Sequence, residues 1–280
     1  MLKLTAASWN WRGLVLETRC GDLALPLRRC QPAPNARIGD VDRQAGVRWL
    51  MSANTGVPSA MVTNRAAVFD AYGTLLDVHA AMARHAERLG PEWQRMSADW
   101  RAKQIEYTWV RSLAGLAHHR DFWTLTREAL DFVAQRHCVT DPALLADVLA
   151  AYRRLDAYPE VPKMLASLRD RGVARAILSN GEPGMLGDAV LSAGIADLLD
   201  DVISVESVGV FKPDPRVYRL VTDRFGLAAE DIGFDSSNPW DAFGALAFGF
   251  CVFWVNRLGQ PDEYGLRGRV TELADLSAVA

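Results

Sequence analysis

The sequence predicts an α/β protein: a Rossmann-like, doubly wound parallel sheet with an inserted helical cap domain. From residue 159 onward, short apolar runs alternate with helical segments, as in parallel strands covered by helices on both faces. The stretch 77–158 interrupts this alternation with helical periodicity alone. Polar clusters directly follow several strands, which is where open α/β sheets form their ligand crevice.

The patterning divides the chain into three regions. Residues 1–60 show no sustained helical or strand period, so we expect either an atypical, poorly ordered N-terminal extension or an over-long start assignment, with Met61 as the true start of the protein. Residues 61–76 and 159–280 are expected to form the α/β core domain. Residues 77–158 are expected to form the helical cap domain.

Individual elements follow from apolar runs and from breaker residues. The predicted core strands span residues 66–69, 174–178, 201–205, 232–234 and 251–255. The predicted helices span residues 99–113 and 121–137 and a third that opens at Asp141 in the cap, and residues 161–171 and 217–225 in the core.

Composition excludes several classes of protein. The net charge of −3 leaves no basic footprint for nucleic acid or for an anionic membrane surface. No apolar run approaches the roughly 20 residues that span a bilayer. Trp9 and Arg12 interrupt the early apolar residues, so the start does not read as a secretory signal, and a cytoplasmic location is expected.

The first strand ends at a carboxylate. Residues 69–77 read FDAYGTLLD, which places Asp70 at a buried strand end as a structural group or a nucleophile. The run resembles motif one of the haloacid dehalogenase superfamily, whose phosphatases carry a second Asp where this chain has Tyr72. Because a phenol, with a pKa of about 10, cannot replace a carboxylate in proton transfer to a leaving group, this favours a halide, which needs no proton.

The next motif lies at the end of a second strand. Residues 177–181 read ILSNG and resemble motif two of the same superfamily. Ser179 and Asn180 offer a hydroxyl, an amide and backbone N–H groups that could hold a carboxylate. A plain polar turn is an equal alternative, because turns favour these residue types.

A lysine marks the third motif. Residues 210–218 read VFKPDPRVY, and Lys212 is one of only four lysines in the chain. Its ammonium could stabilise the charged form of Asp70. Tyr218 falls in the first turn of the next helix, where it either reaches the site or packs.

The fourth motif separates metal-dependent from metal-independent members of the superfamily. Residues 234–242 read FDSSNPWDA. Magnesium-dependent members carry an Asp four residues before the last Asp, and here that position is Ser237, a poor magnesium ligand beside carboxylates. By strand alternation, Asp235 points to a different side. Asp235 and Pro239 depart from the apolar and small residues expected at these two positions.

The predicted cap supplies a positive charge. Residues 99–109 read DWRAKQIEYTW and resemble the dehalogenase cap segment that brings an arginine over the nucleophile. A guanidinium, as in Arg101, can hold a carboxylate or attract a departing halide. Ala102 departs from the expected glutamine.

Together the motifs resemble the L-2-haloacid dehalogenases (type II) over roughly residues 65–257. The resemblance implies hydrolysis of short (S)-2-haloacids to (R)-2-hydroxyacids through an aspartyl ester, with inversion at C2. The catalytic residues that it implies are Asp70, Thr74, Arg101, Lys212, Ser236, Asn238 and Asp241. The substrate-binding residues are Tyr72, Arg101, Ser179, Asn180, Tyr218, Ile105, Phe122 and Trp240, of which the last three would line an apolar halide pocket or simply pack in the core.

The resemblance also implies no cofactor, no metal ion and a homodimer whose other partners are a small 2-haloacid and water. Two alternatives stay open. A magnesium-dependent phosphatase of the same superfamily is disfavoured by Tyr72 and Ser237. A catalytically silent binding protein is disfavoured by the presence of Asp70, Arg101 and Lys212.

Overall fold

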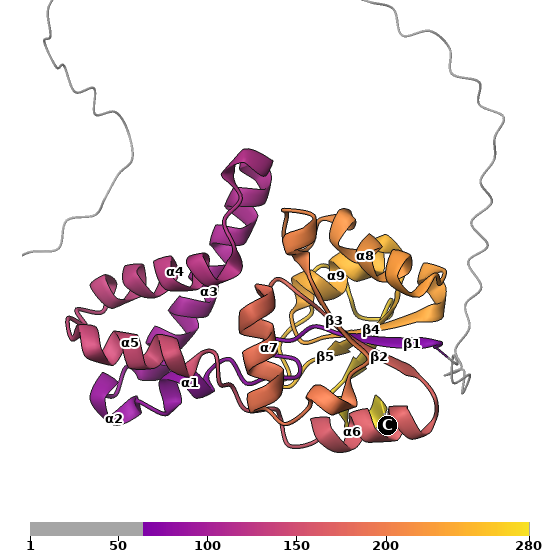
Figure 1. The fold of residues 1–280 in the computed structure, drawn as a ribbon, viewed down its shortest axis with the longest axis horizontal. Helices are drawn as coiled ribbons and strands as arrows, with labels where there is room; N and C mark the ends of the chain where they lie inside the picture. Colours follow the sequence, from indigo (N-terminus) through magenta and orange to yellow (C-terminus); the bar gives the residue numbers. More distant parts are fainter. Residues whose placement is uncertain (1–63, 280) are drawn as a thin grey trace, which may run out of the picture. The chain divides into compact units, whose positions relative to one another are not determined.

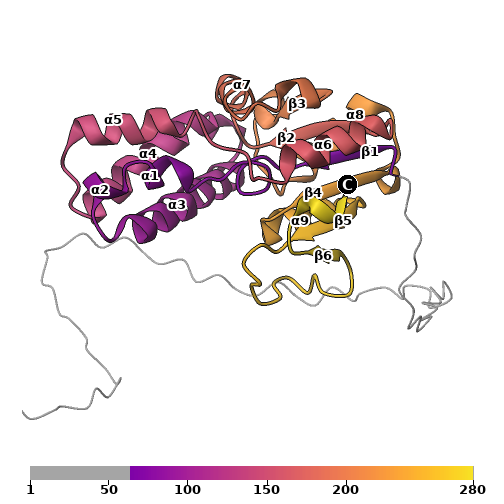
Figure 2. The ribbon, with the colours of Figure 1, turned by 90° about the horizontal axis from the view of Figure 1, so that it is seen from below.

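The structure, a computed structural model, describes residues 64–279. Its core is a six-stranded parallel sheet in the order β3-β2-β1-β4-β5-β6, of which Figure 1 labels β1 to β5 and Figure 2 labels β6. The strands are β1 (Ala66–Phe69), β2 (Ala174–Ser179), β3 (Asp201–Ser204), β4 (Ile232–Ser236), β5 (Cys251–Val255) and β6 (Thr271–Leu273). The four residues of β1 are all buried, as the apolar run predicts for a central strand.

Helices cover both faces of this sheet, which confirms the doubly wound α/β prediction. On one face α6 (Val161–Asp170) packs on β2 and α7 (Pro183–Ser192) packs on β3. On the other, α9 (Pro239–Phe248) packs on β4 and β5, with α8 (Pro215–Phe225) beside it. In Figure 1 the strands lie between α6 below and α8 and α9 above.

Three neighbouring strands end at the same edge of the sheet. The register pairs Phe69 of β1 with Ile177 of β2 on one side and with Asp235 of β4 on the other. Asp70 follows β1 directly, β2 ends at Ser179, and β4 ends one residue after Asp235. The parallel register therefore brings three motifs that are distant in sequence to one edge of the sheet.

Between β1 and α6 the chain is helical, in the region predicted as the cap. The helices are α1 (Ala80–Ala83), α2 (Ala86–Leu89), α3 (Trp93–Ala114), α4 (Phe122–Arg136) and α5 (Pro142–Ala151). Figures 1 and 2 both place this block to one side of the sheet. Asp121 and Asp141 cap α4 and α5 by accepting from backbone N–H groups of the first turn. That this helical block forms a separate cap domain stays a prediction.

Differences from the predicted elements are local. Helix α3 begins at Trp93, six residues before the predicted start at Asp99. Strand β6 was not predicted, because its three partly or fully exposed residues carry no apolar period. The predictions for residues 1–60 and for Met61 lie outside the described residues. Within the described part of the chain, every helix is too short or too polar to cross a membrane.

Asp235 is an unusual occupant of a central strand. The side chain is 1% exposed, and its Oδ1 has no hydrogen-bond partner among residues 64–279. Burial raises the pKa of this carboxyl well above its usual value. Its backbone oxygen accepts from the N–H of Asp70 at 2.9 Å, so the strand that carries this carboxyl also holds Asp70 in place.

Asp235→Asn should flatten the dependence of stability on pH. In the unfolded chain the carboxyl titrates at a pH of about 4. Above that pH the unfolded chain loses the proton, whereas the folded protein keeps it up to the raised pKa, so wild-type stability falls as pH rises. Thermal unfolding between pH 5 and pH 9 should show an advantage of Asp235→Asn over wild type that grows by about 1.4 kcal/mol per pH unit until the raised pKa of the folded protein is reached.

The matched control is Asp223→Asn, which removes a carboxyl that is exposed on α8. Its offset from wild type should stay constant with pH. An Asp235→Asn offset that is equally constant would contradict a buried neutral carboxyl.

Candidate active site

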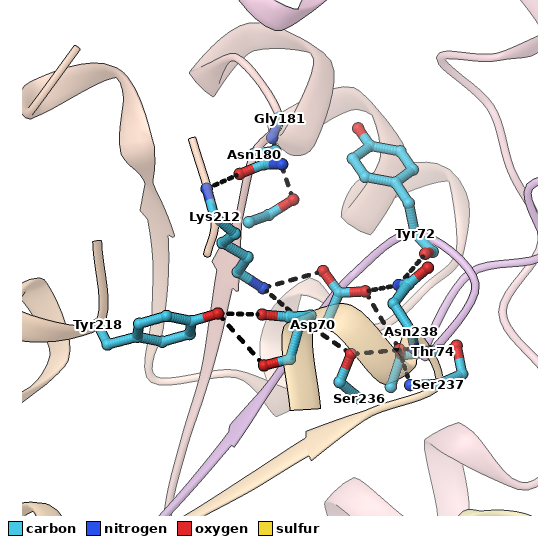
Figure 3. A network of polar contacts seen from close by, with 12 residues as sticks. Asp70, Tyr72, Thr74, Asn180, Gly181, Lys212, Tyr218, Ser236, Ser237 and Asn238 are labelled. Carbon is cyan, nitrogen blue, oxygen red and sulfur yellow. Dashed lines mark hydrogen bonds and ion pairs between the residues drawn. The ribbon is translucent and has the colours of Figure 1, made fainter. Parts of the chain in front are cut away.

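Three side chains converge on the carboxylate of Asp70, which is 5% exposed (Figure 3). Lys212 Nζ donates to Oδ1 at 3.1 Å. Asn238 Nδ2 donates to Oδ2 at 2.8 Å and Thr74 Oγ1 donates to the same oxygen at 3.2 Å. Because both oxygens are held, the carboxylate has one fixed orientation, as a nucleophile requires.

Lys212 joins two carboxylates. Its Nζ contacts Asp70 Oδ1 at 3.1 Å and Asp241 Oδ2 at 2.8 Å, and the lysine side chain is fully buried. The ammonium also lies over the ring of Phe234, 5.0 Å from the centroid. The lysine backbone N–H donates to Asn180 Oδ1 at 2.9 Å. A buried ammonium needs such anionic and polar partners, so the two carboxylates and the lysine form one unit.

Asp241 lies behind Lys212 in a shell of donors. Ser236 Oγ donates to its Oδ2 at 2.9 Å, and Tyr218 Oη donates to its Oδ1 at 2.8 Å. Burial raises the pKa of Asp241, and the Lys212 ammonium opposes that shift. A Cβ at Gly244 would lie 2.4 Å from Tyr218 Oη, so this glycine leaves the room in which the hydroxyl reaches Asp241.

The loop after β1 and the start of α9 interlock. Thr74 Oγ1 accepts from the N–H of Ser237 at 2.9 Å. Gly73 has φ of +93°, and a Cβ there would lie 3.3 Å from Ser237 Oγ. Both the backbone conformation and the close approach of Ser237 therefore favour glycine at this position. Asn238 is the N-cap of α9, yet its side chain makes no cap bond, because the amide donates to Asp70 instead.

Arg101 reaches this loop from α3. Its Nη2 donates to the carbonyl of Tyr72 at 3.1 Å, and Asn238 Nδ2 also donates to that carbonyl at 3.3 Å. Arg101 Nη1 is buried without a partner among the residues that the structure describes. The guanidinium therefore lies beside the nucleophile loop with one nitrogen that has no acceptor among residues 64–279.

A layer of polar groups that sequence reasoning missed supports α3 in this position. Gln104 Nε2 donates to Thr126 Oγ1 at 3.1 Å, and Tyr152 Oη donates to Gln104 Oε1 at 3.2 Å. Gln104 lies within the segment that resembles the dehalogenase cap, so its place near the site could have been predicted from the sequence. Tyr152 offered none, because an isolated helical tyrosine more often simply packs.

Ser179 and Asn180 lie at the end of β2, and the side-chain oxygen of each accepts a backbone hydrogen bond within the protein. Ser179 Oγ accepts from the N–H of Gly181 at 3.1 Å, which is the turn geometry that the residue type favours. Asn180 Oδ1 accepts from the N–H of Lys212. Asn180 thus links motif two to the lysine, whereas contact of either residue with a substrate stays a prediction.

Aromatic side chains enclose the same region. The ring of Tyr72 stacks on Tyr152 with centroids 5.6 Å apart and lies 5.9 Å from Phe122. Burial raises the pKa of Tyr72 well above its usual value, so the phenol stays neutral. Trp240 packs edge-on against Trp109 of α3 at 5.6 Å.

Ile105 and Phe122 are buried, at 7% and 0% exposure. A cavity of about 530 Å³ that is lined by Lys212 and Trp240 adjoins this region, but Ile105 and Phe122 are not in its wall. Tyr218 is not in its wall either, and its hydroxyl donates to Asp241. The structure places the Tyr218 hydroxyl on Asp241, and contact of Tyr218 with a substrate stays a prediction.

Metal-ligating groups do not gather here. Among residues 64–279, no three His, Cys, Asp or Glu side chains are placed to hold one metal ion together. At the position where magnesium-dependent members of the superfamily have an Asp, Ser237 Oγ lies 3.1 Å from Thr74 Oγ1.

Comparison with known proteins gives a consistent result. Residues 64–249 match the family model described as haloacid dehalogenase-like hydrolase. The chain is 42% identical over 214 residues to (S)-2-haloacid dehalogenase 1 of Pseudomonas sp. (strain CBS-3), covering 76% of this chain and 93% of that protein. It is 45% identical over 198 residues to the (S)-2-haloacid dehalogenase of Xanthobacter autotrophicus, covering 70% and 76%.

A solved structure agrees in fold as well as in sequence. The L-2-haloacid dehalogenase of Xanthobacter autotrophicus with chloropropionic acid covalently bound superposes with a TM-score of 0.70. The two chains are 36% identical, and the match covers 77% of this chain and 96% of the other. On its fold, its motif order and these similarities, the chain belongs to the (S)-2-haloacid dehalogenases of the haloacid dehalogenase-like hydrolase family.

Proposed function

We propose that this protein hydrolyses short (S)-2-haloacids to (R)-2-hydroxyacids, with Asp70 as the nucleophile. A carboxylate oxygen of Asp70 attacks C2 from the side opposite the halide, an ester forms, and the halide departs with the bonding electron pair. The observation that carries the proposal is the fixed and charge-paired Asp70 carboxylate, with contacts to Lys212 at 3.1 Å and Asn238 at 2.8 Å. These contacts hold the attacking oxygen ready without reorganisation.

The carboxylate of the substrate and the departing halide need separate partners. The N–H of Arg101 that has no acceptor within the described chain suits the departing halide, together with the side chain of Asn180. Ser179 and backbone N–H groups at the end of β2 are proposed to hold the carboxylate. The buried aromatic surface of Tyr72, Phe122 and Trp240 would exclude water from the attack on saturated carbon.

Water completes the reaction by attacking the aspartyl carbonyl, which releases the 2-hydroxyacid and restores Asp70. Oxygen from water thereby enters the aspartyl group, and the former attacking oxygen leaves on the product. Ser236, Asn238 and Asp241 are proposed to position Lys212 and this water. Splitting the displacement into two steps spares water a direct attack on carbon beside a carboxylate.

We propose that no metal ion takes part. The cation between the two carboxylates is the ammonium of Lys212, and a divalent ion at that point would meet a buried positive charge. The leaving halide needs neither a Lewis acid nor a proton. Where the magnesium-dependent members of the superfamily have two aspartates, this chain has Tyr72 and Ser237. Neither side chain is a good substitute for a carboxylate.

The test is a halide-release assay on both enantiomers of 2-chloropropionate, with and without EDTA. The (S) enantiomer should release chloride at an unchanged rate in excess EDTA, and the (R) enantiomer should not react. Asp70→Asn should lose activity by at least about a thousandfold while remaining folded. Loss of activity on chelation with recovery on adding magnesium would contradict the metal-free mechanism.

Tyr218→Phe separates two roles for this residue. Loss of a hydrogen bond to a charged group, about 1.5–3 kcal/mol, should lower kcat roughly tenfold to a hundredfold and leave KM nearly unchanged, because the hydroxyl contacts Asp241. Steady-state kinetics on (S)-2-chloropropionate measures both constants. A raised KM with normal kcat would instead support the substrate contact predicted from sequence.

We also propose a cytoplasmic homodimer, on the strength of the family resemblance. In support of self-association, the end of α3 and the turn after it expose Val110, Leu113 and Leu116 at 58%, 89% and 59%. Light scattering should give twice the chain mass of 30.9 kDa, and a monomer at micromolar concentration would reject the dimer.

A further inference from the structure

A polar contact joins the turn between α3 and α4 to the segment that follows β3. His119 Nε2 lies 2.8 Å from Glu206 Oε2, and the two side chains are 20% and 22% exposed. Because a carboxylate can only accept, the imidazole donates this hydrogen bond. Glu206 Oε1 also accepts from the N–H of Phe122, the first residue of α4, at 3.3 Å. One carboxylate therefore holds the helical block at two points.

The same turn encloses the residue that precedes Lys212. Phe211 is 1% exposed, and its ring stacks on the imidazole of His119 with centroids 5.1 Å apart. The ring of Phe122 lies 6.3 Å from it on another side. The backbone N–H of Phe211 donates to Ser112 Oγ of α3 at 3.1 Å. The helical block thus fixes both the ring and the backbone of Phe211.

The position of Lys212 depends on this enclosure. Lys212 Nζ lies between two carboxylates, 3.1 Å from Asp70 Oδ1 and 2.8 Å from Asp241 Oδ2. The backbone of Lys212 is held by Asn180, which accepts from its N–H at 2.9 Å, and it continues directly into Phe211. Because the peptide unit between neighbours is rigid, a displacement of Phe211 would move Lys212 as well, and shifts of about 1 Å matter to reacting groups.

We propose that His119 and Glu206 are positioning residues for the reaction. Their contact holds the turn between α3 and α4 against Phe211 and thereby keeps the Lys212 ammonium between its two carboxylates. The inference rests on the proposed function, in which Lys212 steadies the nucleophile. Both residues lie outside the motifs identified in the sequence, because only the folded chain brings these two segments together.

Two substitutions at His119 separate the hydrogen bond from the ring contact. His119→Phe keeps an aromatic ring beside Phe211 and loses the donor to Glu206. His119→Gln loses the ring and keeps a donor, because the amide nitrogen of glutamine can take the place of Nε2. Glu206→Ala removes the acceptor for the imidazole and for the N–H of Phe122 together.

The matched control is Asp188→Asn. Asp188 on α7 pairs with Arg153, which follows α5, at 2.8 Å between partly exposed side chains. This pair also joins the helical block to a helix that covers the sheet, and neither of its members contributes to the contacts of Phe211 described above. A general loosening of the helical block would affect this variant as well.

Steady-state kinetics on (S)-2-chloropropionate give kcat and KM for each variant. His119→Phe and Glu206→Ala should lower kcat roughly threefold to tenfold, the loss expected for a partly exposed hydrogen bond, and leave KM within about twofold of wild type. His119→Gln should recover most of kcat. Asp188→Asn should match wild type in both constants.

Hydrogen exchange followed by mass spectrometry gives a second readout, which needs no substrate. In His119→Phe and Glu206→Ala the peptide that contains Phe211 should exchange at least about threefold faster than in wild type, because its N–H bonds to the turn-bearing helix α3. His119→Gln and Asp188→Asn should exchange at the wild-type rate.

Several results would overturn the positioning role. These are a wild-type kcat or unchanged exchange in His119→Phe and Glu206→Ala, a raised KM with a wild-type kcat, and an equal loss of kcat in Asp188→Asn. Loss in His119→Gln without loss in His119→Phe would assign the effect to the ring and reject the hydrogen bond. Absence of halide release by wild type from any 2-haloacid would refute the proposed function, whereas the exchange of Phe211 tests the contact independently.

Discussion

The ammonium of Lys212, buried between Asp70 and Asp241, is the interaction on which the rest of the site depends. Both carboxylates lie within 3.1 Å of it, and the lysine side chain is inaccessible to water. Removing one member of such a unit leaves an uncompensated buried charge, which costs about 3–5 kcal/mol. The surrounding groups therefore serve to keep the unit complete: Tyr218 and Ser236 hold Asp241, while Asn238 and Thr74 hold Asp70.

The parallel sheet brings the residues of this charged unit together. Parallel strands β1, β2 and β4 end at one edge of the sheet, so short motifs from distant parts of the chain meet there. The Asn180 side chain fixes the backbone of Lys212, and Gly244 leaves room for Tyr218. Arg101 comes from the helical block and contacts the carbonyl of Tyr72, which ties α3 to the loop that carries the nucleophile.

The sequence predicts the positions of the strands and the chemical type of the site residues better than it predicts which neighbour each side chain contacts. The strands at 66–69 and 251–255 were located by their apolar runs, and the observed bounds are the same. The convergence of Asp70, Lys212 and Asp241 follows from motif order combined with the parallel-sheet rule. The direction of Tyr218 could not be predicted, because its position in a helix does not say which neighbour its hydroxyl meets. Ser179 shows the same limit, since its hydroxyl turns back to Gly181.

The central claim, that Asp70 is the covalent nucleophile and lies beside Lys212, is tested most directly by the fate of oxygen in one turnover. Excess enzyme reacts with (S)-2-chloropropionate in H₂¹⁸O, and mass spectrometry follows both products. The account predicts ¹⁸O in the peptide that contains Asp70 and an unlabelled hydroxyl on the 2-hydroxyacid. Label in the 2-hydroxyacid, with an unlabelled peptide, would show direct attack by water and contradict it.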